Sequence, residues 1–251
     1  MTRSVTISML LLLLSLTSGC AATHHQRLGR SQTGERLRLK AIDESVQADA
    51  CRRTALELAS HEKDEHAIAQ FERARELAPS MTGIAHPLAV LYDRQGRMDA
   101  AEREYRQAIA ETPKNPDLLN DYGYFLYSRG DIPEAEAILR KALKLSPKHP
   151  KAALNLGMVL AQRKEFDEAF KQFEAAVGPA AAHHNIGMLL MRDGQESEAV
   201  AHFQKAIQRD PSLSQTNEVL AQLEQRHTEN HPEIQQASAV IAEPGTASLA
   251  D

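Results

Sequence analysis

Apolar residues recur three or four positions apart through the middle of the chain, and no strand-like alternation competes with this helical spacing. The pattern also returns at a fixed interval of 34 residues, which is the distance from Pro79 to Pro113 and from Pro113 to Pro147. Alanines and large apolar residues keep the same interval, which predicts a chain of similar helical units. The repeated alanines are Ala67, Ala101, Ala135 and Ala169, then Ala74, Ala108, Ala142 and Ala176.

Each unit is expected to hold two antiparallel helices of about 13 residues joined by a short turn. Glycine at Gly96 and Gly130 suits a turn that ends the first helix in a left-handed conformation. A glycine or alanine at the eighth place lets the two helices approach, and the large residue at the twenty-fourth place is expected to fill the gap between units. The eighth-place residues are Ala55, Ala89, Gly123, Gly157 and Gly187.

These intervals predict five units: 48–81, 82–115, 116–149, 150–179 and 180–213. The fourth is shorter, because Gly157 and Gly187 lie 30 residues apart and Gly178-Pro179 mark the cut. A capping helix over residues 214–227 and a disordered tail over residues 228–251 are expected to follow.

The repeated residues resemble the tetratricopeptide repeat (TPR) family. The resemblance implies an all-α fold, a right-handed superhelical solenoid of helix-turn-helix pairs with about five repeats and a C-terminal capping helix. This chain departs from the family at Glu62 and Lys164, where glycine is usual, and at Cys51, which we expect to be small and buried.

Residues 1–19 read as a signal peptide, because a short basic start precedes an apolar run too short to span a bilayer. The run closes in Leu16-Thr17-Ser18-Gly19-Cys20, which resembles a bacterial lipobox. That resemblance implies lipidation at Cys20 and a place in the bacterial cell envelope, on the outer membrane facing the periplasm. A plain signal peptide and an N-terminal anchor helix are the alternatives.

Residues 20–47 are expected to form a basic, flexible linker, since residues 23–40 carry five Lys or Arg against Glu35 alone. Two further interpretations stay open. A partial helix could run from Leu37 to Val46, and the basic stretch could touch anionic headgroups beside the anchor.

Composition narrows the function. The net charge is -5, with 29 Lys and Arg against 34 acids, which disfavours a general nucleic-acid binder. Two cysteines cannot form a disulfide framework. His61 and His66 lie five residues apart, so they cannot share one metal face on a helix. His183 and His184 are adjacent, and one is expected to face the interior. We expect no cofactor, no metal and no enzymatic activity.

The family resemblance also implies a binding surface. In TPR proteins the inner face is lined by the second, fifth, ninth and twelfth places of the first helix, and here those places are rich in Tyr, Met and Leu. Such a strip suits a protein or peptide client. The alternatives are that these residues pack between units, or that the capping helix covers Met188 and Met191. The predicted groove residues are His86, Val90, Asn120, Tyr124, Tyr127, Leu154, Met158, His184, Met188 and Met191.

The sequence thus predicts a membrane-anchored, non-catalytic adaptor that binds a protein or peptide. A narrower hypothesis is a pilus or secretion-system assembly lipoprotein, because LLNDYGYFLYSRGDIPEAE resembles the middle repeat of type IV pilus pilotins and Tad pilus lipoproteins share the plan. A peptidoglycan-hydrolase adaptor, a spacer without a client, self-association through an exposed end, and an enzyme or metal carrier using the histidines remain as alternatives.

Overall fold

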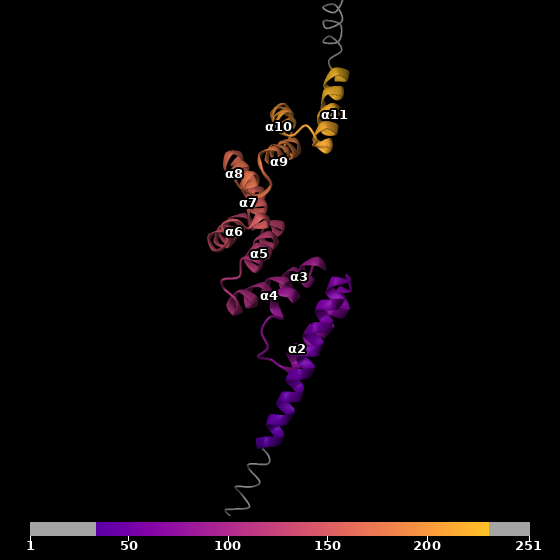
Figure 1. Cartoon of the computed structure of the whole chain (residues 1–251), viewed down its shortest axis with the longest axis vertical. Coiled ribbons are helices and arrows are strands. Elements are labelled where there is room, and N and C mark those ends of the chain that lie inside the picture. The colour runs from indigo at the N-terminus through magenta and orange to yellow at the C-terminus, as the bar shows by residue number, and fades with distance from the viewer. Residues whose placement is uncertain (1–33, 231–251) are drawn as a thin grey trace, which may run out of the picture. The chain divides into compact units, whose positions relative to one another are not determined.

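The computed structural model describes residues 34–230, which consist of helices and the turns that join them (Figure 1). No strand occurs within this range, which confirms the predicted all-α class. A first helix covers residues 34–60. The others are α2 (Asp64–Leu77), α3 (Ala85–Arg94), α4 (Met98–Glu111), α5 (Pro116–Arg129), α6 (Ile132–Leu145), α7 (Pro150–Gln162), α8 (Phe166–Val177), α9 (Pro179–Arg192), α10 (Glu196–Arg209) and α11 (Ser214–Asn230).

The chain divides into two compact units. The first ends at Glu111 and contains the helix over residues 34–60 with α2, α3 and α4; the second begins at Thr112 and contains α5 to α11. Within each unit, consecutive helices contact one another as pairs, such as α3 with α4, α5 with α6, and α7 with α8. The described helices therefore form five successive pairs followed by α11.

Glycines hold the paired helices of the second unit together. A Cβ atom built on Gly123 would lie 2.6 Å from Cγ of Leu139, and one on Gly187 would lie 2.5 Å from the ring of Phe203. Side chains do not come this close without one of them moving. The expected close approach at the eighth place is therefore confirmed, and the large residue of the second helix fills the space that the glycine leaves.

The turns inside the pairs share one backbone conformation, even where the residue is not glycine. Gly96 and Gly130 have φ of 70° and 92°. Glu62 and Lys164, at the corresponding positions of other repeats, have φ of 57° and 63°. The repeat geometry thus imposes a left-handed residue at this place, although such a φ is unfavourable for a side chain with a Cβ atom.

Connections between the pairs differ in length. Residues 146–149 join α6 to α7, whereas Gly178 alone joins α8 to α9. Gly178 has φ 82° and ψ 168°, a region open almost exclusively to glycine. Pro179 then starts α9 at once, since its fixed φ suits the first helical position.

The first helix corrects one prediction. The flexible linker expected over residues 20–47 is wrong from residue 34 onward, because residues 34–47 are helical and continuous with the first repeat helix. No Pro or Gly interrupts residues 35–60, and local pairs support the helix. Nζ of Lys40 lies 3.7 Å from Glu44, and the Gln47 amide donates to Asp43 at 2.9 Å.

The other end differs less. Helix α11 continues to Asn230, beyond the expected end at residue 227. The signal peptide over residues 1–19, the lipidation site Cys20 and residues 231–251 of the expected tail lie outside the described residues. From residue 34 to 230, no helix combines the length and the apolar character needed to cross a bilayer.

Cys51 also departs from expectation. It carries a free thiol and is half-buried instead of buried. It lies on the first described helix, so no earlier repeat among the described residues covers its outer side.

Candidate functional site

Three consecutive repeats of the second unit begin with helices α5, α7 and α9, respectively. Between α7 and α9 the surface opens into a hollow of about 330 Å³, which we call the α7–α9 hollow. It combines apolar and thioether side chains with two amides, a composition typical of peptide sites. Its lining residues are Leu154, Asn155, Met158, Phe173, Asn185, Met188 and Leu189.

One of the two amides of the hollow, Asn155, is oriented by a hydrogen bond to α5. Asn155 donates from Nδ2 to Oδ1 of Asn120 at 2.9 Å, and Asn120 donates in turn to Oδ1 of Asp121 at 3.0 Å. Asn120 is only 4% exposed, so α5 fixes the orientation of Asn155 on α7. A carboxamide has two N–H donors and an oxygen acceptor. Asn155 therefore keeps hydrogen-bonding capacity beyond the bond that orients it.

Two tyrosines extend the surface on α5. The ring centroids of Tyr124 and Tyr127 lie 6.4 Å apart and the rings are tilted by 37°. Tyr124 is exposed and Tyr127 is half-buried. Because α5 contacts α7, these rings belong to the same group of helices as the hollow. Each offers a large apolar area with a polar tip.

The structure brings together only part of the predicted groove. Leu154, Met158 and Met188 share the α7–α9 hollow, and Asn120 reaches it through Asn155. Met191 is half-buried on α9. His86 and Val90 are half-buried on α3, in the first unit, and the ring of His86 lies 6.5 Å from that of Tyr105.

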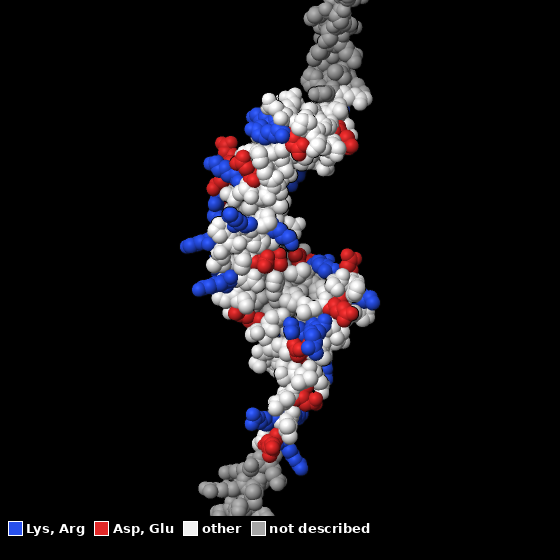
Figure 2. Space-filling view, in the orientation of Figure 1, with Lys and Arg blue, Asp and Glu red and all other residues white. Residues whose placement is uncertain are grey.

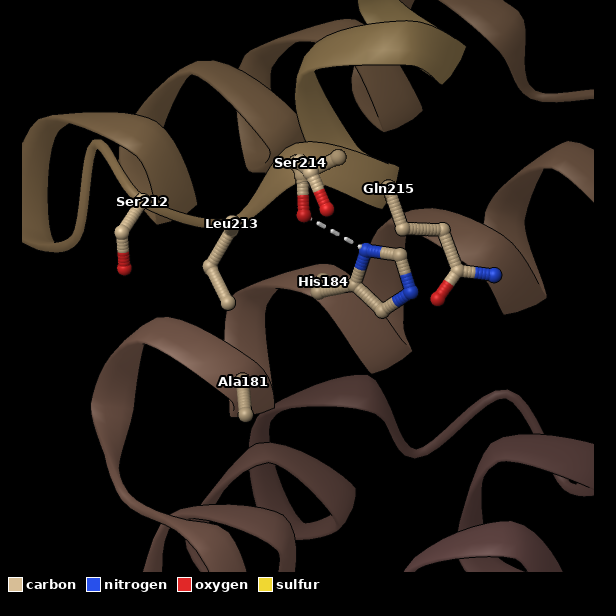
Figure 3. A pocket seen from close by; sticks show the side chains of 7 residues that line it. Ala181, His184, Ser212, Leu213, Ser214 and Gln215 are labelled. Atoms are coloured by element: carbon tan, nitrogen blue, oxygen red, sulfur yellow. Dashed lines mark hydrogen bonds between the residues drawn. The ribbon is translucent and has the colours of Figure 1, made fainter.

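His184 lies at a second pocket, where α9 meets α11 (Figure 3). Its Nδ1 is 2.9 Å from Oγ1 of Thr216, which is itself buried, and burial lowers the pKa of the imidazole. The capping helix thus engages His184 but leaves Met188 exposed. The pocket has a volume of about 270 Å³ and is lined by Ala181, His184, Ser212, Leu213, Ser214, Gln215 and Thr216.

A pair of histidines joins α9 to α10. Nδ1 of His183 lies 3.2 Å from Nδ1 of His202, and the Phe170 ring lies 4.5 Å from the His183 ring. Burial, with smaller contributions from nearby cations, lowers the pKa of His183 to about 4. Burial also lowers the pKa of His202. The expected interior histidine is therefore His183, which is buried, although its partner was not foreseen.

A basic surface covers the end of α6 and the turn after it. Residues 140–151 contain five Lys or Arg and no acid. Figure 2 shows blue side chains projecting over this part of the molecule. Arg140 pairs with Glu136 and Glu168, at 2.8 and 3.3 Å. The remaining cations are Lys141, Lys144, Lys148 and Lys151.

Metal ligands do not gather in the described part of the chain. From residue 34 to 230, no group of three His, Cys, Asp or Glu side chains could hold a metal ion. His61 lies in the turn after the first helix and His66 on α2.

Residue-by-residue reasoning missed Asn155 and Asn185. They occupy the sixth place of their repeats, as Asp121 does in the preceding one, at intervals of 34 and 30 residues. The period already found would have located this row of polar residues. The predicted groove residues occupy the second, fifth, ninth and twelfth places of the family pattern, so the sixth place was not included.

Comparison with known proteins agrees with this geometry. Family models described as tetratricopeptide repeats match residues 53–116 and 180–213. A model described as the middle TPR-like domain of cilia and flagella-associated protein 70 matches residues 86–184. The type IV pilus assembly protein PilF of Pseudomonas aeruginosa is 35% identical over 65 residues, which is 26% of this chain and 26% of PilF. The matched segment thus spans about a quarter of that relative.

Solved structures show the same fold. The structure of YrrB, described as a TPR protein with an unusual peptide-binding site, is 25% identical, covers 72% of this chain and 96% of its own, and has a TM-score of 0.56. Pseudomonas aeruginosa PilF is 23% identical, with coverage of 78% and 99% and a TM-score of 0.55. PilW, described as a type IV pilus biogenesis factor, is 22% identical, with coverage of 78% and 98% and a TM-score of 0.56.

The helix pairs, the glycine contacts within them and the left-handed turn residue define an all-α helical-repeat protein. The chain is a tetratricopeptide repeat protein, and it resembles type IV pilus-assembly factors of that family.

Proposed function

We propose that the chain is a non-catalytic adaptor whose second unit binds an extended segment of a client protein along α5, α7 and α9. The observation that carries this proposal is the α7–α9 hollow, where apolar walls meet an amide fixed in place by Asn120. An extended peptide can use both the apolar walls and the amide, because its side chains require pockets and its backbone requires hydrogen-bonding partners.

The chemistry of the hollow suits one apolar client side chain. Met158 and Met188 can adapt to different shapes, and Leu154 with Leu189 supplies fixed apolar wall. Asn155 would exchange hydrogen bonds with the client backbone beside that side chain. The similarity to YrrB, a TPR protein with an unusual peptide-binding site, supports the same kind of ligand.

The test uses two methionines of matched exposure. Met188, at the hollow, is 42% exposed, and Met98, on α4 of the first unit, is 40% exposed. Client capture is measured by crosslinking in the native envelope followed by mass spectrometry, with circular dichroism as the fold control. Met188→Lys and Tyr124→Ala with Tyr127→Ala should both lose the client. Met98→Lys should keep it, and equal capture by all variants would remove the hollow from the account.

We further propose that the mature chain is lipidated at Cys20 and faces the periplasm from the outer membrane. The sequence from Leu16 to Cys20 supports this proposal. Several acyl chains carried by one N-terminal cysteine residue would anchor a protein firmly, since each buried methylene adds about 0.8 kcal/mol. Metabolic labelling with an alkyne fatty acid should mark the wild type and Cys51→Ser but not Cys20→Ser. Labelling of Cys20→Ser would refute the assignment.

Pilus or secretion-system assembly is the second candidate, and the matched segment of PilF favours it over other adaptor roles. Deleting the gene should reduce the number of surface pili, and the wild-type gene should restore them. Met188→Lys should fail to restore them if the client belongs to that machinery. Normal piliation in the deletion strain would leave the adaptor proposal standing and reject this pathway.

A further inference from the structure

The beginning of the first helix is the most exposed apolar part of the described chain. Leu37, Leu39, Ile42 and Val46 are 63%, 61%, 52% and 62% exposed. Packing of this helix starts only at Ala48, which is fully buried. Side chains of this size rarely stay in water without a partner when they adjoin one another on one element.

Three of these residues form one stripe. Leu39, Ile42 and Val46 are spaced by three and four residues, so they lie on the same face of the helix. Glu35 precedes the stripe by four residues, and Asp49 follows it by three. The apolar seam is therefore about two turns long. A coiled coil needs such a seam over three or four heptads, so pairing with a second copy is disfavoured.

The charged residues beside the stripe indicate what kind of partner covers it. Arg36 and Arg38 fall near opposite edges of the stripe, since each residue turns the helix by about 100°. Lys40 follows, and Arg27 and Arg30 precede the helix in the sequence. Three acids lie between residues 34 and 47, and two of them have local partners, because Glu44 lies near Lys40 and Asp43 accepts from Gln47. An apolar face with basic edges is the pattern of helices that lie on anionic membranes.

The position in the chain points the same way. Residue 34 follows Cys20 by 14 residues, which can span at most about 50 Å when fully extended. If Cys20 is acylated, as proposed above, the helix begins within that reach of a bilayer. We propose that residues 34–47 lie on an anionic lipid surface, with Leu39, Ile42 and Val46 below the headgroups and Arg36 and Arg38 among them.

This contact would give the protein a second attachment, which restricts how the first unit stands on the membrane. The inference rests on the proposed anchor only for bringing the helix near the bilayer. The apolar stripe and its basic edges are independent of acylation. The two ideas can therefore fail separately.

The experiment uses the full chain in a Cys51→Ser background, purified from host membranes and added to vesicles. A fluorophore is attached at Ile42→Cys or, as the matched control, at the neighbouring exposed position Ala41→Cys, which faces about 100° away. Quenching by lipids that carry a spin label in the acyl chain is compared. In vesicles of phosphatidylethanolamine with phosphatidylglycerol, the signal at position 42 should be quenched roughly threefold more than at position 41. Replacing phosphatidylglycerol by phosphatidylcholine should reduce the difference.

Several results would overturn the proposal. Equal quenching at positions 41 and 42 would show that no face enters the lipid, and vesicle flotation with no quenching would leave the anchor intact without the helix contact. Disulfide formation between two Ile42→Cys chains in the absence of vesicles, with doubled mass by light scattering, would assign the stripe to a second copy. By contrast, quenching at position 42 in a chain that takes up no fatty acid would support the helix contact and reject only the anchor.

Discussion

The Cα of Gly157 faces the ring of Phe173 so closely that a Cβ atom there would lie 2.5 Å from Cε1. The two residues belong to α7 and α8, the pair that forms one wall of the α7–α9 hollow. The absence of a side chain at Gly157 thus allows Phe173 to fill the space between the helices and also reach the hollow.

This contact predicts the effect of adding one methyl group. Gly157→Ala should lower the free energy of unfolding by about 1–3 kcal/mol, because the flanking ring cannot withdraw from between the helices. Thermal or urea unfolding followed by circular dichroism measures the change. Gly34→Ala is the control, since nothing lies within 4 Å of its added Cβ atom. An unchanged midpoint for Gly157→Ala would contradict the packing described.

The non-glycine turns predict a stabilising substitution. Lys164 has φ of 63°, and glycine adopts this conformation without the strain of a Cβ atom. Lys164→Gly should raise stability by about 0.5–1 kcal/mol. Loss of its 3.4 Å contact with Asp193 should subtract little, because the lysine is exposed. Gly130→Ala, at the equivalent place, should change stability in the opposite direction, and a destabilised Lys164→Gly would refute the strain argument.

The histidine pair predicts an acid-sensitive fold. The pKa of His183 is about 4 in the folded chain and near 6.5 when unfolded, so the unfolded state binds more protons between these values. The stabilisation is fully present above pH 6.5 and is lost as the pH falls toward 4. Urea unfolding at pH 7 and pH 5 should differ by about 1–2 kcal/mol from this group. His183→Leu should show a smaller difference, and an equal one would assign the acid sensitivity elsewhere.

A fourth prediction concerns the start of α7. Nδ1 of His149 accepts from the backbone N–H of Ala152 at 3.1 Å, and its Nε2 lies 3.0 Å from Asp117 on α5. His149→Ala should cost about 1 kcal/mol through the lost cap. His149→Asn keeps a capping oxygen and should recover most of that loss. Both values follow from denaturant midpoints, and two equal losses would mean that the cap contributes nothing.

The helix pairs could be predicted from the sequence because each place of the repeat requires one class of residue, so the same class recurs at a fixed interval. The period of 34 residues assigned Gly123 and Leu139 to fixed places of the repeat, and the structure shows that these two places face each other. The linker prediction for residues 20–47 rested on the basic charge of residues 23–40. It did not take into account that residues 34–47 are mostly good helix formers, and these residues are helical. No pattern along one helix could reveal that His183 meets His202, because this contact depends on how α9 and α10 cross.

The candidate site was predicted less completely than the fold. Family places identified Leu154, Met158 and Met188 of the hollow but not its other two apolar members, Phe173 and Leu189. The family places also put His184 in the groove, although it contacts Thr216 of α11. This contact depends on the position of α11, which the family pattern does not give. Asn155 was missed because its bond to Asn120 joins two repeats, and such a bond follows from the stacking of helices and not from either repeat alone.

The single-residue junction at Gly178 leaves little freedom in how α9 follows α8. Loops of variable length let many repeat arrays widen or narrow the space between neighbouring repeats. Here α8 passes into α9 through one glycine whose backbone angles few other residues tolerate. Insertions or substitutions at this junction would change the position of α9. If the α7–α9 hollow binds a client as proposed, a change of specificity would therefore come from the side chains that line the hollow.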